Sequence, residues 1–332
     1  MSARATFALL APLALAASPL AAATIKEVKL ADGREPVNAI SSPLFDTASV
    51  GSLRIASFEG AYDKKAKIVR RTGGFMTKGP QYDLDPAINL GDLLAEALRS
   101  EAAAMGFRLS SGEDFVWSVK GTLKDIYVES RQVPYGATQF WGYMDVEFEV
   151  QKAGETPASQ RLRTHKYYGA YNAGFGRKDE ATEGLTHLLV EGAQEMLARL
   201  NRQHFKAPTH PDMEAKAKVV GPGQDKRHDL YLVGLSGAAG ATPVLMSAIP
   251  AVKDENDRAA MIEALGHLGK TEAIAFLAGR YATEDEDCRW ETLRAMDTIG
   301  GQEALAVVAK GTKDENEACR RLTARILGAP AK

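Results

Sequence analysis

The side chains best suited to metal chemistry, six histidines, are scattered along the chain. His204 and His210 are six positions apart with Pro208 between them, and no histidine pair has the His-Glu-x-x-His spacing that places two zinc ligands on one helical face. The acidic run at 285–287 lacks the glycine and terminal glutamate of an EF-hand calcium loop. The sequence therefore predicts no metal site and no bound cofactor.

Nucleophilic and phosphate-binding motifs are also missing from the sequence. The closest approach to a Gly-x-Ser-x-Gly nucleophile elbow is the run at 234–237, Gly-Leu-Ser-Gly, which has the wrong spacing. No Gly-x-x-x-x-Gly-Lys-Ser/Thr phosphate loop occurs. We therefore predict no catalytic residue, and expect a protein that binds rather than catalyses.

Bulk composition narrows the class of protein. The chain has 332 residues, a formal net charge of −2, 45% hydrophobic residues and 25% charged residues. Nucleic-acid binders carry a basic excess, so no nucleic-acid partner is expected. The apolar content is enough to bury a core, and the length predicts two domains.

The first 23 residues have the layout of a secretory signal peptide. Arg4 supplies a positive start, 7–17 is an apolar run, and 21–23 is Ala-Ala-Ala, with small residues at −3 and −1. An amino-terminal membrane anchor is the alternative, but the run is short and prolines interrupt it. No later stretch is long and apolar enough to span a bilayer, so a periplasmic mature chain starting at Thr24 is expected, with only peripheral contact to the envelope.

Residues 24–205 predict an α+β domain with an antiparallel sheet and two long helices. Asp85-Pro86 is a helix-start signal, and Gly106 a stop signal. The expected helices are 86–105 and 180–202. The expected strands are 52–58, 66–71, 115–129, 140–151 and 160–171.

The last two strands predict their own pairing. On 140–151 apolar residues alternate with Asp145, Glu147 and Glu149, as in a sheet with one dry face. A hairpin folded about Glu155 gives matching pairs on both faces. These pairs are Glu149 with Arg161, Glu147 with Arg163, Asp145 with His165, and Phe148 with Leu162.

Aromatic residues continue the charged face of this hairpin. They are Trp141, Tyr143, Tyr167 and Tyr171. Contiguous exposed aromatics mark interaction sites. Tyrosines are also at home in strands, where they fill the edge of a core or lie under a loop. Both interpretations remain open from the sequence.

The order of these elements resembles the YajG-like family of bacterial envelope proteins. The resemblance rests on Leu90-x-x-Leu93-Leu94 through Gly106-Phe107 and on the strand pairs that follow. That family is typically lipid-anchored and has no catalytic motif. This chain has no cysteine at the expected cleavage point, so a lipid anchor is not expected.

Residues 206–225 are rich in proline, glycine and lysine, and predict a semi-flexible connector. After them Leu235, Leu265 and Met296 fall in register at spacings of 30 and 31 residues. Acidic turns recur with them, each followed by an arginine, and suit the start of a helix. The period predicts stacked helical pairs that share one core.

Residues 226–328 resemble short HEAT repeats of the phycobilin-lyase-like type. The resemblance implies an all-α solenoid that binds a protein partner along its second helices, near 273–280 and 304–310. Some relatives attach bilin pigments, but export argues against that activity here. We expect Arg280, Tyr281 and Lys310 to project outward for the partner. The expected stacking residues are Ile274, Leu277, Leu305 and Val308.

Two cysteines, Cys288 and Cys319, lie 31 residues apart, at the same position in adjacent repeats. Packed helices are about 8–10 Å apart, whereas a disulfide needs Cα atoms within about 7 Å. Both thiols are therefore expected to be free.

The function predicted from these features is a non-catalytic binding or scaffold protein of the bacterial envelope whose repeats dock a protein. Two alternatives remain. The repeats serve only to support the amino-terminal domain, or the chain is an accessory factor or an enzyme with a site between its two domains.

Overall fold

The computed structural model describes residues 23–28, 30, 38–62, 69–72, 81–132, 138–170 and 178–328. Apart from Ala23, the expected signal peptide lies outside these residues. Within them, no helix is long and apolar enough to cross a membrane.

The amino-terminal part is an eight-stranded mixed sheet with two long helices, which confirms the α+β class. The strands are β1 (Ala23–Ile25), β2 (Ser52–Gly60), β3 (Val69–Thr72), β4 (Gln81–Leu84), β5 (Arg108–Leu109), β6 (Trp117–Gln132), β7 (Thr138–Lys152) and β8 (Ala158–Ala170). The long strands β6, β7 and β8 pair antiparallel, as expected. β2 and β3 instead run parallel to successive halves of β6. Within the described part of the chain, β8 pairs only with β7 and forms an edge of the sheet.

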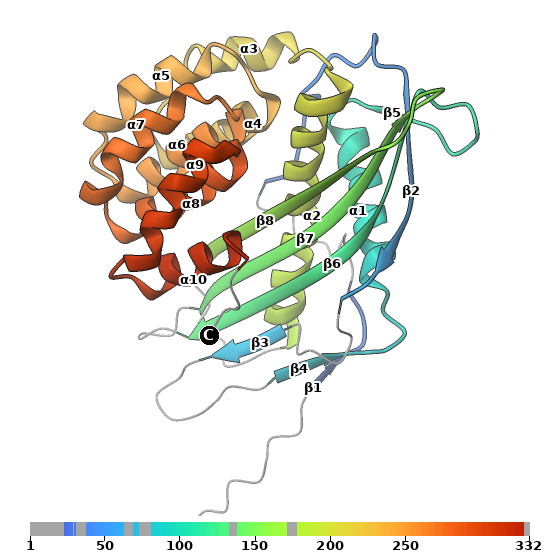
Figure 1. Cartoon of the computed structure of the whole chain (residues 1–332), viewed down its shortest axis with the longest axis horizontal. Coiled ribbons are helices and arrows are strands. Elements are labelled where there is room, and N and C mark those ends of the chain that lie inside the picture. Colours follow the sequence, from blue (N-terminus) through green and yellow to red (C-terminus); the bar gives the residue numbers. More distant parts are fainter. Residues whose placement is uncertain are drawn as a thin grey trace, which may run out of the picture.

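Helices α1 (Leu90–Ala104) and α2 (Lys178–Leu200) cover one face of the sheet (Figure 1). Met144, Val146 and Phe148 point toward them and are fully buried, which confirms the apolar face of β7. The predicted start of α1 was wrong. Asn89 is the N-cap, and its side chain accepts a hydrogen bond from the Gly91 N–H. Asp85 closes a separate turn before the helix, where its carboxylate accepts from the Ala87 N–H.

The predicted hairpin register was wrong by two residues. Glu147 lies opposite Arg161, Asp145 opposite Arg163, and Val146 opposite Leu162. The turn between the strands is centred one residue earlier than expected, near Gly154, which adopts a φ of +81°. A slip of two residues leaves every side chain on its own face, so the alternation could not detect it.

The carboxy-terminal part is a two-layer stack of helices. Its first row contains α4 (Arg227–Ser236), α6 (Glu255–Leu268), α8 (Glu286–Ile299) and α10 (Glu317–Ile326). Its second row contains α5 (Ala241–Ala248), α7 (Glu272–Arg280) and α9 (Gly301–Val308). One helix of each row makes a unit, and α10 is a final half unit, as the sequence period predicted.

The recurring acidic turns cap helices of the first row, as expected. The carboxylates of Asp254 and Asp285 accept hydrogen bonds from the N–H groups three residues later, and Asn316 caps α10. The recurring arginines have a further role. Arg258 binds Glu284 and Asp285 of the next unit, and Arg289 binds Asp314 and Glu315 in the same way.

The segment 206–225 contains a helix that its composition did not predict. α3 (Pro211–Ala217) packs against α4, and its residues Met213 and Ala217 are fully buried. Part of the semi-flexible connector expected there is therefore a packed helix. The domain boundaries at 206 and 225 remain proposals.

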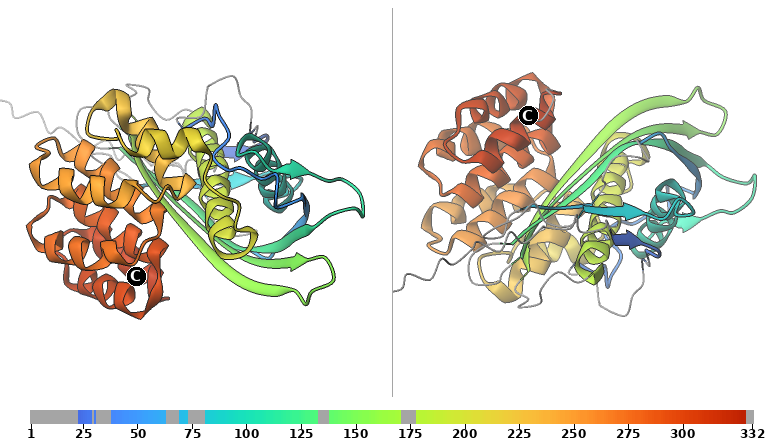
Figure 2. Two further views of the ribbon diagram at one scale, coloured as in Figure 1. Left: turned by 90° about the horizontal axis from the view of Figure 1, so that it is seen from above. Right: turned by 90° about the horizontal axis from the view of Figure 1, so that it is seen from below.

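The sheet lies between the α1–α2 pair and the repeats, and the stack continues around the β8 edge to reach α2 (Figure 2). Tyr231, Leu232 and Leu235 of α4 belong to the same apolar core as the sheet and its helices. The two parts thus share a core at their junction.

Candidate interaction surfaces

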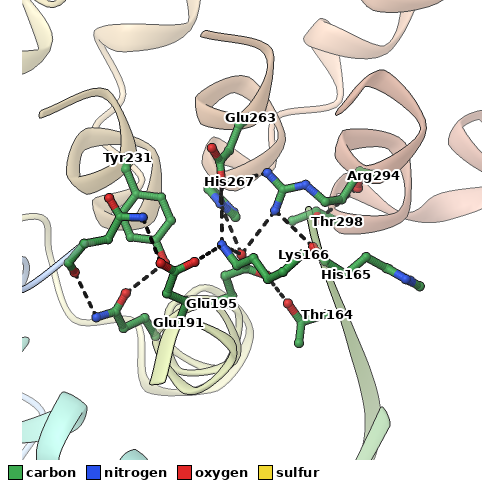
Figure 3. A network of polar contacts seen from close by, with 12 residues as sticks. Thr164, His165, Lys166, Glu191, Glu195, Tyr231, Glu263, His267, Arg294 and Thr298 are labelled. Atoms are coloured by element: carbon green, nitrogen blue, oxygen red, sulfur yellow. Dashed lines mark hydrogen bonds and ion pairs between the residues drawn. The ribbon is translucent and has the colours of Figure 1, made fainter. Parts of the chain in front are cut away.

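The first row of the repeats is joined to the amino-terminal domain by a buried polar network (Figure 3). Lys166, on the edge strand β8, is at its centre with 4% of its surface exposed. Its Nζ lies 2.6 Å from Glu195 and 3.0 Å from Glu191, both on α2, and 3.5 Å from Glu263 on α6. One lysine therefore connects a strand, a helix of the same domain and a repeat.

Arg294 of α8 supplies the second cation of this network. Its guanidinium lies 2.7 Å from Glu263, 3.2 Å from Glu195 and 2.7 Å from Glu291. A neutral hydrogen bond extends the network to α4: the Tyr231 hydroxyl donates to the side chain of Gln194 on α2 at 2.8 Å. Each of α4, α6 and α8 thus contributes a side chain.

The charges in the network hold one another in their ionised forms. Burial opposes the charge on Glu195, but Lys166 and Arg294 outweigh it and hold the pKa of this carboxyl at about 2. Burial likewise opposes the charge on Lys166, whose pKa is nevertheless raised well above its usual value by Glu191 and Glu195. At the rim of the network, burial raises the pKa of Glu291 to about 7 against the opposing effect of Arg294.

In the described ranges, two clusters of acidic, histidine or cysteine side chains have their ligand atoms close enough together to hold a metal ion. They are Glu195–Glu263–His267 and Glu284–Asp285–Cys288. Lys166 and Arg294 already bind the carboxylates of the first group. Arg258 and Arg280 bind those of the second. Lysine and arginine side chains thus neutralise the carboxylates of both clusters, and these ion pairs connect different elements of the fold.

The aromatic strip predicted on the hairpin is partly covered by the repeats. Tyr143 is buried, and its hydroxyl donates to Asp145 at 2.9 Å. α10 packs over this region, and the Arg325 guanidinium lies 4.8 Å from the Tyr143 ring centroid. Trp141 is half-buried. Tyr167 is on β8, but the position of its side chain and the whole of Tyr171 lie outside the described residues.

Asp145 was expected on a solvated face, and that expectation was wrong. The residue has 1% of its surface exposed, because the sheet face that carries it turns toward the repeats. Arg161 binds its carboxylate through two hydrogen bonds, at 2.6 and 2.8 Å. Arg163, beside it, donates to the Ile326 carbonyl at the end of α10. The far end of the hairpin, with Glu147 and Glu149, is solvated, and there these two carboxylates pair with Lys124 and Lys120.

The three partner-binding residues predicted on the second row differ in their surroundings. Lys310 is exposed, as expected. Arg280 is tied to Glu284 through Nε at 2.7 Å. Tyr281 does not project outward: it is buried with 7% exposure, and its hydroxyl donates to Asp314 of the next unit. Tyr281 is therefore a stacking residue, and sequence alone did not separate it from its exposed neighbours.

Among the apolar residues expected in the stack, Ile274, Leu277 and Val308 are buried, as predicted. Leu305 is 40% exposed. Its equivalent one unit earlier is Ile274, which lies within the stack, whereas α9 is the last helix of the second row. No later second-row helix covers Leu305 among the residues that the structure describes.

The exposed face of the second row combines small and charged residues. The small ones are Ala275, Gly279, Ala306 and Ala309, with Leu305 beside them, and the exposed charged ones include Glu272, Glu303 and Lys310. No motif marks it in the sequence. The signal that could have located this face is the helical spacing of small residues between the buried positions.

Both cysteines are free and fully buried. Each Sγ donates to a carbonyl in the preceding first-row helix, Cys288 to Glu255 and Cys319 to Glu286, again 31 residues apart. Burial raises the pKa of both thiols, that of Cys319 to about 12.

We expect these two thiols to be inert in the folded protein, because a buried protonated thiol is a poor nucleophile. A chromogenic disulfide reagent should detect no thiol at neutral pH under native conditions and two thiols after denaturation without reductant. Rapid reaction of the native protein would contradict the packing at these positions. A count of zero after denaturation would show that the thiols pair.

Comparison with known proteins supports the repeat assignment. Residues 233–329 match the family model for HEAT repeats. No curated protein matches the chain. Solved structures resemble the chain as well, among them the following three. A Xanthomonas campestris protein of the DUF330 family is 11% identical, with a TM-score of 0.32 over 47% of this chain and 87% of its own.

A minor lipoprotein from Acinetobacter baumannii is 13% identical, with a TM-score of 0.26 over 48% of this chain and 95% of its own. An uncharacterised protein is also 13% identical, with a TM-score of 0.27 over 44% and 89%. The match to the family model and the helical stack agree in position, because α5 to α10 lie within the residues that match the model for HEAT repeats.

Proposed function

We propose that this protein is an exported, non-catalytic scaffold of the bacterial envelope that docks a protein partner on the second row of its HEAT repeats. The proposal rests on one observation: the two rows of helices differ in their position relative to the amino-terminal domain. Helices α4, α6, α8 and α10 all contact the amino-terminal domain. α5 and α7 lie on the far side of the stack from the sheet in Figure 1.

The occupied first row supplies the reason for a partner on the second. HEAT repeats offer two surfaces, and here the first is covered by the protein's own sheet and helices. The second keeps exposed small residues, among them Ala275 and Ala306, over which a partner can approach the helices closely. A role limited to supporting the amino-terminal domain would not require such a face. That alternative predicts that substitutions on it have no effect on binding.

Charge insertion on this face tests the proposal. Ala275→Glu and Ala306→Glu should each leave the melting temperature within a few degrees of the parent, because surface substitutions change stability by about 0.5 kcal/mol or less. Capture of the partner from periplasmic extract should fall at least about tenfold, since an unpaired charge in an interface core costs more than 1.4 kcal/mol. Full capture by both variants would refute the proposal.

Ala103→Glu is the matched control. Ala103 is an exposed alanine on α1, which covers the opposite side of the sheet from the repeats. Its capture should equal that of the parent. Deleting the repeats would be a poorer test, because it would remove Glu263 and Arg294, which pair with Lys166 and Glu195 in the buried network.

Export has a separate test. Cleavage after Ala23 would leave Thr24 and Ile25 in β1, where Ile25 is buried and the strand pairs with β4. We expect the periplasmic fraction to contain a chain whose amino-terminal residue is Thr24, as measured by intact mass. Membrane-bound protein that still begins at Met1 or Ser2 would contradict this assignment.

A further inference from the structure

A pocket open to solvent, with a cavity volume of about 50 Å³, lies between the sheet and the last repeats, on the face opposite α1 and α2. Its floor is formed by adjacent rungs of the sheet, where Tyr127 of β6 pairs with Tyr143 of β7 and Trp141 lies two residues away. Trp290 of α8 lines it as well. The floor is therefore mainly aromatic.

The roof of the pocket is one face of α10. Ala318, Arg321, Leu322 and Arg325 line it at the i, i+3, i+4 and i+7 spacing of a single helical stripe. Because α10 is a half unit, its packing surface meets the sheet and leaves this space between them. The pocket thus belongs to both parts of the chain and would be lost if they separated.

The charges around the pocket do not balance. Arg321 binds the buried carboxylate of Glu129, and Lys166 is directed to Glu191 and Glu195. The remaining cation, Arg325, lies over the rings of Tyr127 and Tyr143 at 4.7 and 4.8 Å.

Arg325 has no carboxylate within 4.0 Å among the described residues. Its charge reaches Asp125, whose carboxylate lies beyond ion-pair distance and whose pKa is raised by burial despite Arg325. The lining therefore carries one positive charge with no partner in direct contact.

We propose that this pocket binds a small carboxylate with a flat apolar body. An arginine stacked on aromatic rings keeps the N–H groups at the edge of its guanidinium available, and these fit a carboxylate in a bidentate manner. Tryptophan and leucine side chains offer the apolar contact for the body. The mixture of aromatic walls with few polar groups is typical of small-ligand sites.

The size of the pocket limits the ligand. At about 10–15 Å³ of cavity volume for each water, it holds only a few waters. That suits a small ligand whose flat body is partly exposed at the open side, rather than a long lipid chain. The inference is independent of the proposed partner surface, which lies on the other row of helices.

Isothermal titration calorimetry of the purified mature chain tests this site, with 2-naphthoate as the probe and 2-naphthamide as its neutral counterpart. The parent protein should bind the carboxylate more tightly than the amide. Arg325→Gln should weaken naphthoate binding by about tenfold to a hundredfold, the usual effect of losing a hydrogen bond to a charged group. The affinity for naphthamide should change little.

Two further variants keep the test decisive. Ala318→Leu fills the pocket from the same helical stripe and should weaken both probes, even if Arg325→Gln is too unstable to measure. Arg320→Gln is the matched control, because Arg320 is on the same helix but donates to the carbonyls of Asp314 and Glu315. Absence of naphthoate binding by the parent, equal affinity for the two probes, or naphthoate binding by Ala318→Leu at the parent's affinity would overturn the proposal.

Discussion

Replacing Lys166 with methionine should destabilise the protein by about 3–5 kcal/mol, the cost of removing one partner from a buried ion pair. Methionine has a similar length and keeps the apolar contacts of the stem. The loss therefore comes from Glu191 and Glu195, which would stay buried with fewer cations beside them. Urea unfolding followed by circular dichroism measures this change in the free energy of unfolding.

Lys120→Met is the matched control for this substitution. Lys120 also pairs with a glutamate on a neighbouring element, Glu149 at 2.7 Å, but about half of its side chain is exposed. Exposed pairs contribute up to about 1 kcal/mol. Equal losses in the two variants would show that the network at Lys166 is solvated, and that the repeats are not held to the sheet in the way described.

Gly266→Ala should cost about 1–3 kcal/mol, because an added methyl group has no room there. Gly266 lies on α6 where it crosses α8, and a Cβ would come within 2.7 Å of the Ala295 Cα atom. The contact is with backbone, so relief requires the two helices to separate. The midpoint of urea unfolding should fall accordingly.

Gly279→Ala should have the opposite sign. Gly279 is on the exposed face of α7, and a Cβ there would meet no atom within 4 Å. Alanine is favoured over glycine in helices by about 1 kcal/mol at most, so this variant should be slightly more stable than the parent. A stabilised Gly266→Ala variant would contradict the close packing of the first row.

The repeats were predictable because their signals are local and occur several times. Leu235, Leu265 and Met296 recur at nearly constant spacing, and all three are fully buried. Asp254 and Asp285 cap helices, as short-range rules for helix starts predict. Repetition made a weak local pattern specific, and the family match extends over the same region.

The contacts between the two parts could not be predicted in this way. Lys166 and Asp145 look like solvated strand residues, since nothing within their own strands shows that a helical stack will cover the β8 edge. Tyr281 and Leu305 were misplaced for a related reason. Their burial depends on whether a following unit packs beside them, and that depends on the length of the stack as well as on the residue type.

The sheet shows the same limit in a different form. Alternation along β7 correctly separated the face of Met144 and Val146 from that of Glu147, but a two-residue slip of the hairpin preserves this alternation. The parallel pairing of β2 with β6 joins segments about sixty residues apart, and a single sequence contains no direct signal for it.

Photo-crosslinking from the second row is the most direct test of the central claim, that this row is the free surface and takes a protein partner. A photoreactive amino acid would be placed at Ala275, and at Ala103 as the control, in cells that export the protein. We predict one discrete crosslinked species from position 275 that is absent from position 103. No crosslink at 275, or the same products from both positions, would contradict the account.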